Sequence, residues 1–252
     1  MKNPQPRKWH RLVSASVLTI LFRSFHVQRA LAENLNHVDV KYEDYNEQAG
    51  RMHISTIAAA FEASITSSLS MRGGYIYDSI SGATPTGGPP LAPGQGVPLI
   101  HLRDIRRAEN LELTKSWGFY SITPGVSYSK ESDYESLGLA LNQTFDFNQK
   151  NTTVTLGLSH DFDRVVPHNP PNAFFLAAAR KDTTDALIGL TQLLGPKTIL
   201  TANFTFGHAE GYLTDPDRGF YFSDHPDPVG SQTLFGEQRP DNKNREVVFL
   251  GL

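Results

Sequence analysis

Acidic side chains gather in one late stretch of the sequence, where they could bind a cation. Asp215, Asp217, Asp224 and Asp227 lie close together there, with His225 among them. Calcium takes about six to eight oxygen ligands, and Asp-rich loops supply them. The spacing lacks the regularity of an EF-hand, however, and the Asp–Pro pairs in this stretch are typical of turns. We therefore predict a solvated acidic loop, with calcium binding as the less favoured interpretation and no cofactor elsewhere.

The side chains that catalysis most often uses show no recognisable arrangement. No two of the nine histidines have the i, i+4 spacing of a zinc protease on an expected helix, so we interpret His160 and His208 as surface groups. Ser79 follows Asp78, but a nucleophilic serine also needs a base and an orienting group, for which the sequence gives no pattern. The absence of cysteine excludes thiolate metal sites and disulfides. We predict no catalytic site.

Three arginines lie around one aspartate as the chain approaches an expected strand. Arg103, Arg106 and Arg107 flank Asp104. A basic wall inside a pore would tune the passage of anions, since charges that line a pore set its selectivity. The interpretation that the spacing favours is a rim of salt bridges.

The composition limits the classes of protein to consider. The net charge is −3, which gives no reason to expect a nucleic-acid partner. Fifteen Phe and nine Tyr, against two Trp and three Met, favour strands, where aromatic side chains pack well. At 252 residues the chain is long enough for one sizeable domain.

The N-terminus has the order of a secretory signal peptide. Basic residues precede an apolar run of eleven residues (12–22), which is too short to span a membrane as a helix. Ala30, Leu31 and Ala32 then form a small-residue cleavage site. Arg23 and Arg29 make this region unusually basic, and the alternative is a disordered leader on a cytoplasmic protein. We predict a signal peptide over residues 1–32, which implies export.

Beyond residue 38 the apolar residues recur with a period of two. Four segments show it clearly: 121–129, 137–147, 153–162 and 199–208. In the third, Leu156 and Leu158 alternate with Thr155 and Gly157. Successive side chains of a strand point to opposite faces, so each segment predicts a strand with one apolar and one polar face. We expect about nine strands, with a tenth beginning near Arg245.

The connections between the expected strands alternate between short and long. Short turns are predicted near Glu62–Ser64, near Ser116–Gly118, and at 148–150 and 195–197; long loops are predicted over 79–100, 164–181 and 211–244, with a shorter connection at 130–133 on the same side. Outer-membrane barrels have this asymmetry, with short periplasmic turns and longer outer loops. Segments of about ten residues, and small residues on the polar faces, also favour a membrane barrel.

We therefore predict an all-β fold over residues 33–252: an antiparallel, up-and-down transmembrane β-barrel of about ten strands in the outer membrane of a Gram-negative bacterium. Its role would be structural or transport-related. Its expected partners are outer-membrane lipid and, during insertion, the barrel-assembly machinery. One alternative is a soluble periplasmic β-sandwich that binds a ligand through its long loops. A second is a barrel enzyme with catalytic residues at the outer rim.

Several short stretches carry a resemblance to a known family. They are 42–45 with 50–51, 129–137, 211–216, 239–241 and, most specifically, a DSISGATPTG string that contains Asp78, Ser79, Ser81, Gly82, Ala83, Thr84, Pro85, Thr86 and Gly87. Together they resemble a bacterial family of outer-membrane β-barrel proteins of unknown function. The resemblance covers 38–252 and implies the fold and the location, but no catalytic residues. Its members are longer, so we expect an incomplete barrel: either a curved, partly open sheet or a strained closure between residues 38–46 and 245–252.

Overall fold

The computed structural model describes residues 36–47, 51–85, 94–96, 99–166, 178–214, 219–221, 234–236 and 238–252. The described residues belong to one compact unit, Asn36–Leu252. The expected signal peptide lies outside them, as do the calcium candidates Asp215, Asp217, Asp224 and Asp227 and the last two residues of the family motif, Thr86 and Gly87.

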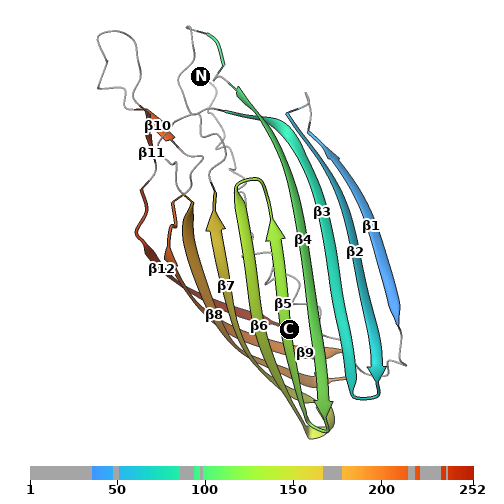
Figure 1. The fold of residues 1–252 in the computed structure, drawn as a ribbon. Helices are drawn as coiled ribbons and strands as arrows, with labels where there is room; N and C mark the ends of the chain where they lie inside the picture. The colour runs from blue at the N-terminus through green and yellow to red at the C-terminus, as the bar shows by residue number, and fades with distance from the viewer. Residues whose placement is uncertain are drawn as a thin grey trace, which may run out of the picture. The chain divides into compact units, whose positions relative to one another are not determined.

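Ten strands form one antiparallel sheet in which neighbours along the chain are neighbours in space (Figure 1). They are β1 (His37–Asn46), β2 (Met52–Thr66), β3 (Leu69–Pro85), β4 (Leu99–Trp117), β5 (Tyr120–Lys130), β6 (Tyr134–Phe147), β7 (Thr152–Val165), β8 (Ala179–Gly195), β9 (Thr198–Gly211) and β12 (Asn242–Gly251). The short strands β10 (Gly219–Tyr221) and β11 (Leu234–Gly236) pair with each other between β9 and β12 in the sequence. The predicted all-β, up-and-down fold with ten strands is confirmed.

The two-residue periodicity forms the strands because each pairs in register with its neighbours over most of its length. Thr155 of β7 faces Thr144 of β6 and Gly189 of β8, while the next residue, Leu156, faces Gln143 and Ile188. Residues that lie opposite each other on neighbouring strands point to the same face of the sheet. Because the register is constant, the apolar residues of every strand lie on one face. The faces predicted for the four alternating segments are confirmed.

Tight connections join the strands at one end of the sheet, called here the turn end. The predicted turns at 148–150 and 195–197 are found: a 3₁₀ turn, Asn148–Lys150, and a tight turn at Pro196 and Lys197. The first turn is wrong by several residues, because β2 runs on to Thr66 and the chain reverses at Ser67 and Ser68. The register between β2 and β3 shifts between Ser64 and Thr66, just before this turn. The alternation of apolar and polar residues is irregular there, so the sequence placed the turn too early.

The strands extend further toward the other end, the loop end, than the sequence indicates. Residues 79–85, expected to begin a long loop, continue β3, and β4 spans 19 residues. β3 pairs with β4 over its whole length, from Leu69 opposite Lys115 to Pro85 opposite Leu99. Glycine and proline weakened the strand signal in this stretch, but pairing along the whole length of β3 overrides that local preference.

The sheet is curved and open (Figure 1). β1 and β12 are its two ends, and among the described residues no pairing joins them. Of the two outcomes expected for the ends of the sheet, the structure has the curved, open one. None of the described residues forms a helix with the length and hydropathy needed to cross a membrane.

Candidate functional site

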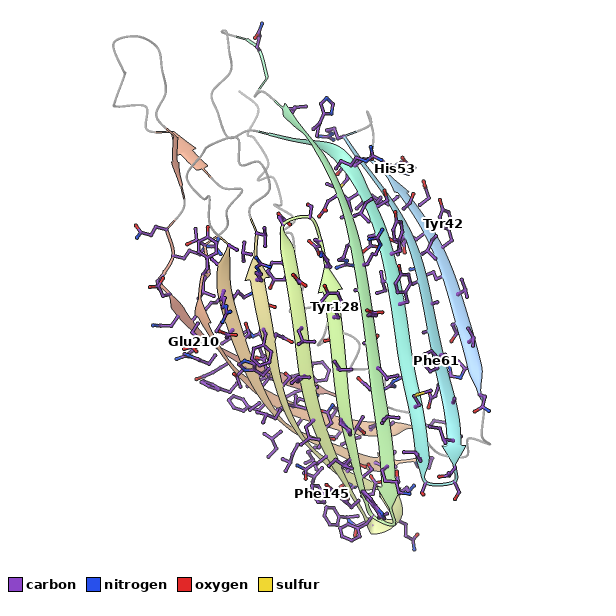
Figure 2. All side chains as sticks on the ribbon, viewed as in Figure 1. Tyr42, His53, Phe61, Tyr128, Phe145 and Glu210 are labelled. Atoms are coloured by element: carbon purple, nitrogen blue, oxygen red, sulfur yellow. The ribbon has the colours of Figure 1, made fainter. Side chains whose placement is uncertain are left out.

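The convex face of the sheet carries the large apolar side chains and leaves them exposed. Its middle band includes Val40, Ile57, Leu111, Val126, Leu139, Leu158, Ile188, Phe204 and Val248, all on the same side by register. Phe61, Tyr128 and Phe145, labelled in Figure 2, belong to the same face. Leu158 is 55% exposed although it lies mid-strand in the middle of the sheet. A soluble protein rarely exposes a contiguous apolar patch of this extent, so the face requires an apolar environment.

Aromatic side chains mark the turn end of the apolar band. Trp117 stacks on Tyr120 with ring centroids 5.9 Å apart, and Tyr120 contacts Phe145 at 5.1 Å. Phe119 and Phe147 form a further pair at 6.3 Å. Aromatic girdles of this kind flank the lipid-facing band of outer-membrane barrels at the membrane–water interface.

The concave face is polar and more buried. Asp78, Asp163 and Thr183 are between 5% and 7% exposed. Curvature accounts for the contrast, because side chains converge on the concave side of a sheet and spread apart on the convex side. Among the described residues Val165, at 7%, is the one apolar side chain buried to the same degree, so the sheet largely reverses the usual order of a soluble protein.

Ion pairs join the strands on the concave face. Arg106 on β4 donates from Nε to Asp78 Oδ2 on β3 at 2.8 Å, and Thr56 donates to the other oxygen of Asp78 at 2.6 Å. Lys181 lies 3.0 Å from Asp163. Two further pairs on this face are Arg72–Glu112 and Arg245–Asp185. Buried carboxylates need such partners, since an unpaired charge there would cost several kcal/mol.

Glycines make room for these polar side chains. Arg245 on β12 reaches across β9 to Asp185 on β8, with an Nη2–Oδ1 distance of 2.9 Å. Gly207 lies between them on β9, where a Cβ would be 2.2 Å from Asp185 Oδ1. The same arrangement recurs where a glycine faces an Asn or Asp directly across the strands: Gly74 and Asn110, Gly138 and Asp161, Gly157 and Asn142, Gly189 and Asn203.

The family motif is divided between the two faces of β3. Asp78 points to the concave face, where it is held by Arg106 and Thr56. Ser79 and Ser81 lie on the convex face, in register with Ile105 and Arg103. Gly82 lies against β2, where a Cβ would meet the Arg51 carbonyl oxygen at 2.5 Å. Ala83, Thr84 and Pro85 continue the pairing with β4. Contacts thus explain Asp78 and Gly82, whereas for Ser79 and Ser81 the structure gives the face on which they lie.

The arginines around Asp104 do not form one group. Arg106 lies on the concave face in its ion pair, whereas Arg103 and Arg107 lie on the convex face. Neither the basic pore wall nor the salt-bridged rim is therefore correct for all three, because adjacent strand positions point in opposite directions. Arg107 packs over the Tyr77 ring at 5.8 Å.

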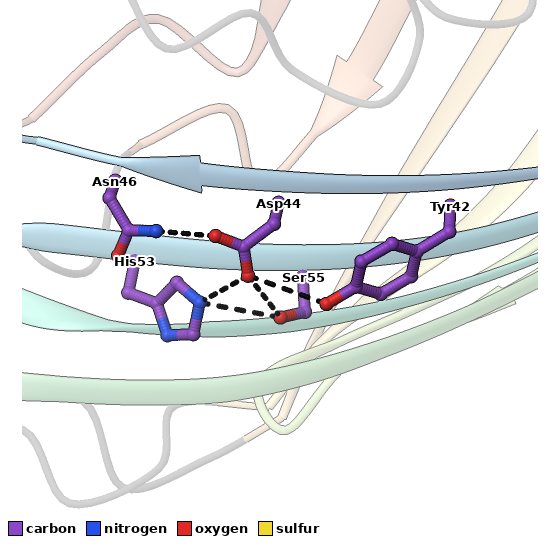
Figure 3. Close-up of polar contacts among 5 residues, drawn as sticks. All are labelled: Tyr42, Asp44, Asn46, His53 and Ser55. Atoms are coloured by element: carbon purple, nitrogen blue, oxygen red, sulfur yellow. Dashed lines mark hydrogen bonds and ion pairs between the residues drawn. The ribbon is translucent and has the colours of Figure 1, made fainter.

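A polar cluster that the sequence did not reveal lies at the loop end of β1 and β2 (Figure 3). His53 Nε2 is 2.8 Å from Asp44 Oδ2 and 3.4 Å from Ser55 Oγ, and Tyr42 and Asn46 also contact Asp44. In a Ser–His–Asp relay the serine and the carboxylate use different imidazole nitrogens. Here both lie at Nε2, so this arrangement does not activate the serine. β1 and β2 are consecutive strands, and the cluster forms because their register places Asp44 opposite Ser55 and Asn46 opposite His53.

Three carboxylates meet at the β5–β6 connection. Oxygens of Asp104, Glu131 and Asp133 lie within 4.8 Å of one another. Burial, and then the negative charge of Asp104, raises the pKa of Glu131. The backbone amides of Ile105, within β4, and of Ser132, in the β5–β6 connection, donate to Asp104 Oδ1. These three groups would provide only part of the roughly six to eight oxygens that calcium takes.

His160 and His208, interpreted from the sequence as surface groups, make hydrogen bonds to the residues opposite them on neighbouring strands. His160 Nδ1 lies 2.8 Å from Thr184 Oγ1, and His208 Nδ1 lies 2.7 Å from Asn244 Oδ1. Both are on the convex face near the loop end. Their positions agree with surface groups close to the ends of strands.

A single up-and-down meander of ten antiparallel strands, apolar on one face and polar on the other, defines the class of this protein. The chain belongs to the family described as "Protein of unknown function (DUF3570)", which matches residues 11–98 and 95–252. The comparison with curated proteins gives no match.

Two solved structures are similar to this chain. One is OmpT (in-vitro folded), an outer membrane protein of Vibrio cholerae, with 11% identity, a TM-score of 0.46, and coverage of 81% of this chain and 62% of that one. The other is the trimer form of the same protein, with 12% identity, a TM-score of 0.42, and coverage of 82% and 63%. The chain thus spans less than two thirds of the length of these structures.

Proposed function

We propose that this chain forms the wall of a β-barrel in the outer membrane, with a structural or transport-related role. One observation carries the proposal: the exposed face of the sheet is apolar and the buried face is charged and hydrogen-bonded. In an outer-membrane barrel the apolar face contacts lipid, and the polar face lines the interior. On β6 the outward-facing residues from Leu137 to Phe147 are apolar except for Gln143. At about 3.3 Å per residue and a tilt near 40°, that stretch spans roughly 25 Å, close to the apolar band of such barrels.

Export and orientation are part of the same proposal. Residues 1–32 would direct secretion, leaving a mature protein that begins near Glu33. The turn end would face the periplasm, and the long connections after β3, β7 and β9 would face the exterior. Insertion would require the barrel-assembly machinery. The polar concave face suits a lining in contact with side chains or water, and no reaction is assigned to it.

The periplasmic sandwich gains no support. A sandwich buries its apolar face against a second sheet. Among the described residues the second sheet consists of the three-residue strands β10 and β11, which are far too small to cover the apolar face.

Substitution by arginine on the two faces tests the proposal. Leu156→Arg places a charge in the apolar band, and Thr155→Arg places the same charge on the polar face one residue away. We expect Leu156→Arg to destabilise the membrane-inserted protein by about 2–4 kcal/mol and Thr155→Arg to cost less. Both variants are expressed in a Gram-negative host, the protein is quantified in outer-membrane fractions, and unfolding is followed in urea. Recovery of the wild-type protein in the soluble periplasmic fraction would reject the proposal, and equal costs would reject the assigned faces.

A further inference from the structure

A row of cations crosses the convex face at the loop-end border of the apolar band. By register, Arg107 on β4 faces Lys130 on β5, Lys130 faces Glu135 on β6, Glu135 faces Arg164 on β7, and Arg164 faces Arg180 on β8. Four cations therefore stand beside one anion at a single level of the sheet. Neighbouring strands lie about 4.8 Å apart, so the row is roughly 20 Å long.

Within the row itself, cations outnumber anions four to one. Arg107 and Lys130 are direct cross-strand neighbours, as are Arg164 and Arg180, and like charges in such positions are destabilising. All four side chains are exposed. Within the part of the chain that the structure describes, none has a carboxylate within ion-pair distance. The one acid of the row, Glu135, accepts a hydrogen bond from Tyr128 at 2.7 Å.

Its position relative to the apolar band indicates what could balance the charge. On the three middle strands the next outward-facing residue toward the turn end is Tyr128 after Lys130, Leu137 after Glu135, and Phe162 after Arg164. On the two outer strands of the row it is acidic: Glu109 after Arg107 and Asp182 after Arg180. On β5, β6 and β7 the row therefore begins where the apolar surface ends. At the turn end of the convex face, the described strands carry one cation, Lys115, beside the aromatic pair Trp117 and Tyr120. The cationic border is a property of the loop end.

We propose that this row binds the phosphate groups of an anionic lipid in the outer leaflet. The inference rests on the proposed function, which puts the loop end at that leaflet. Arginine pairs with phosphate through two parallel hydrogen bonds, and a phosphate between two cations about 5 Å apart neutralises both. The acyl chains of the same lipid would lie along the apolar band directly below. Phosphate on a lipid thus matches both the charge and the position of the row.

The test uses the protein extracted from outer membranes in mild detergent. Bisphosphorylated lipid A is titrated, and bound lipid is counted by native mass spectrometry, with fully dephosphorylated lipid A as the second probe. Two double variants remove charge from the row: Arg107→Gln with Lys130→Gln, and Arg164→Gln with Arg180→Gln. The matched control removes two exposed lysines at the turn end, Lys150→Gln with Lys197→Gln.

We expect wild-type and control proteins to prefer the phosphorylated lipid, and each row variant to bind it about tenfold or more weakly, with unchanged binding of the dephosphorylated lipid. Rising salt should weaken the preference of the wild type. Equal wild-type binding of the two lipids overturns the inference even if the row variants fail to assemble, as does a row variant that matches the control. A wild-type protein found outside the outer membrane overturns the proposed function and this inference with it. An outer-membrane protein that does not distinguish the two lipids overturns the inference alone.

Discussion

Glycine on the concave face of this sheet is a spacer between polar groups. Gly207 leaves the gap through which Arg245 reaches Asp185, and a side chain there would enter the space of the carboxylate. Gly157 and Gly189 have the same relation to the amide oxygens of Asn142 and Asn203. Glycine weakens a strand by itself. Its cost here is offset by ion pairs and hydrogen bonds that larger residues would exclude.

Gly207→Ala tests this role. The added Cβ would lie 2.2 Å from Asp185 Oδ1 and 3.4 Å from Arg245 Nε, so the ion pair must shift or break. We expect a loss of about 1–3 kcal/mol in the free energy of unfolding, measured by denaturant titration. Gly195→Ala is the control, because a Cβ there meets nothing within 4 Å. Similar stability of the two variants would contradict the spacer role.

Glu131 should make stability depend on pH in a defined direction. Burial and the nearby Asp104 raise the pKa of Glu131 above its ordinary value of 4.5. Its contribution is therefore fully present below pH 4.5 and is lost as the pH rises through the raised folded-state pKa. We expect Glu131→Gln to stabilise the protein at pH 7 and to have less effect at pH 4, by denaturant titration at both values. Asp241→Asn, at an exposed side chain just before β12, controls for the change in net charge. A larger gain at pH 4 would contradict the assignment.

At the scale of elements, the two ends of the strands differ in chemistry as well as in connection length. The turn end has tight reversals and stacked aromatic rings, whereas the loop end has the row of cations and the long connections. Several strands exceed the roughly ten residues that a tilted strand needs to cross a bilayer, and β3 and β4 exceed it most. The excess lies toward the loop end, so these strands would project beyond the lipid on that side.

Protease treatment of intact cells tests this orientation. We expect cleavage within the connection between β3 and β4 and within the connection between β9 and β12, because long loops face the exterior in outer-membrane barrels. The turn Asn148–Lys150 should be spared, since it would face the periplasm. Lysed cells provide the control, in which protease reaches both ends. Cleavage of intact cells at that turn alone would invert the orientation.

At the scale of the whole molecule, the two edge strands of the sheet have backbone groups that would be costly to leave unpaired in a membrane. β1 and β12 each present an edge without a strand partner among the described residues. In lipid, each unsatisfied backbone group would cost several kcal/mol, so both edges must be paired or covered in the membrane.

Disulfide cross-linking in the assembled protein shows whether the edges pair with each other. The chain has no cysteine, so any disulfide that forms must join the two introduced cysteines. Val40→Cys is combined in turn with Glu246→Cys, Val248→Cys or Leu250→Cys, which samples several registers of β12. We expect none of them to cross-link within one molecule as efficiently as Val40→Cys with Ala59→Cys, whose residues are paired neighbours on β1 and β2. An equally efficient intramolecular β1–β12 disulfide on a gel would show that ten strands close.

The sequence by itself determined the strands and their faces, because both follow from a two-residue period that is local to each segment. Leu156 outward and Thr155 inward could be predicted without knowing any partner strand. Tertiary structure alone decided what depends on register between distant strands: the ion pair of Arg245 with Asp185, the opposite directions of Arg106 and Arg107, and the meeting of Asp44 with His53. It also decided how far β3 extends, since pairing with β4 there outweighs the weak strand preference of glycine and proline. Period is a property of a segment, whereas register is a property of pairs.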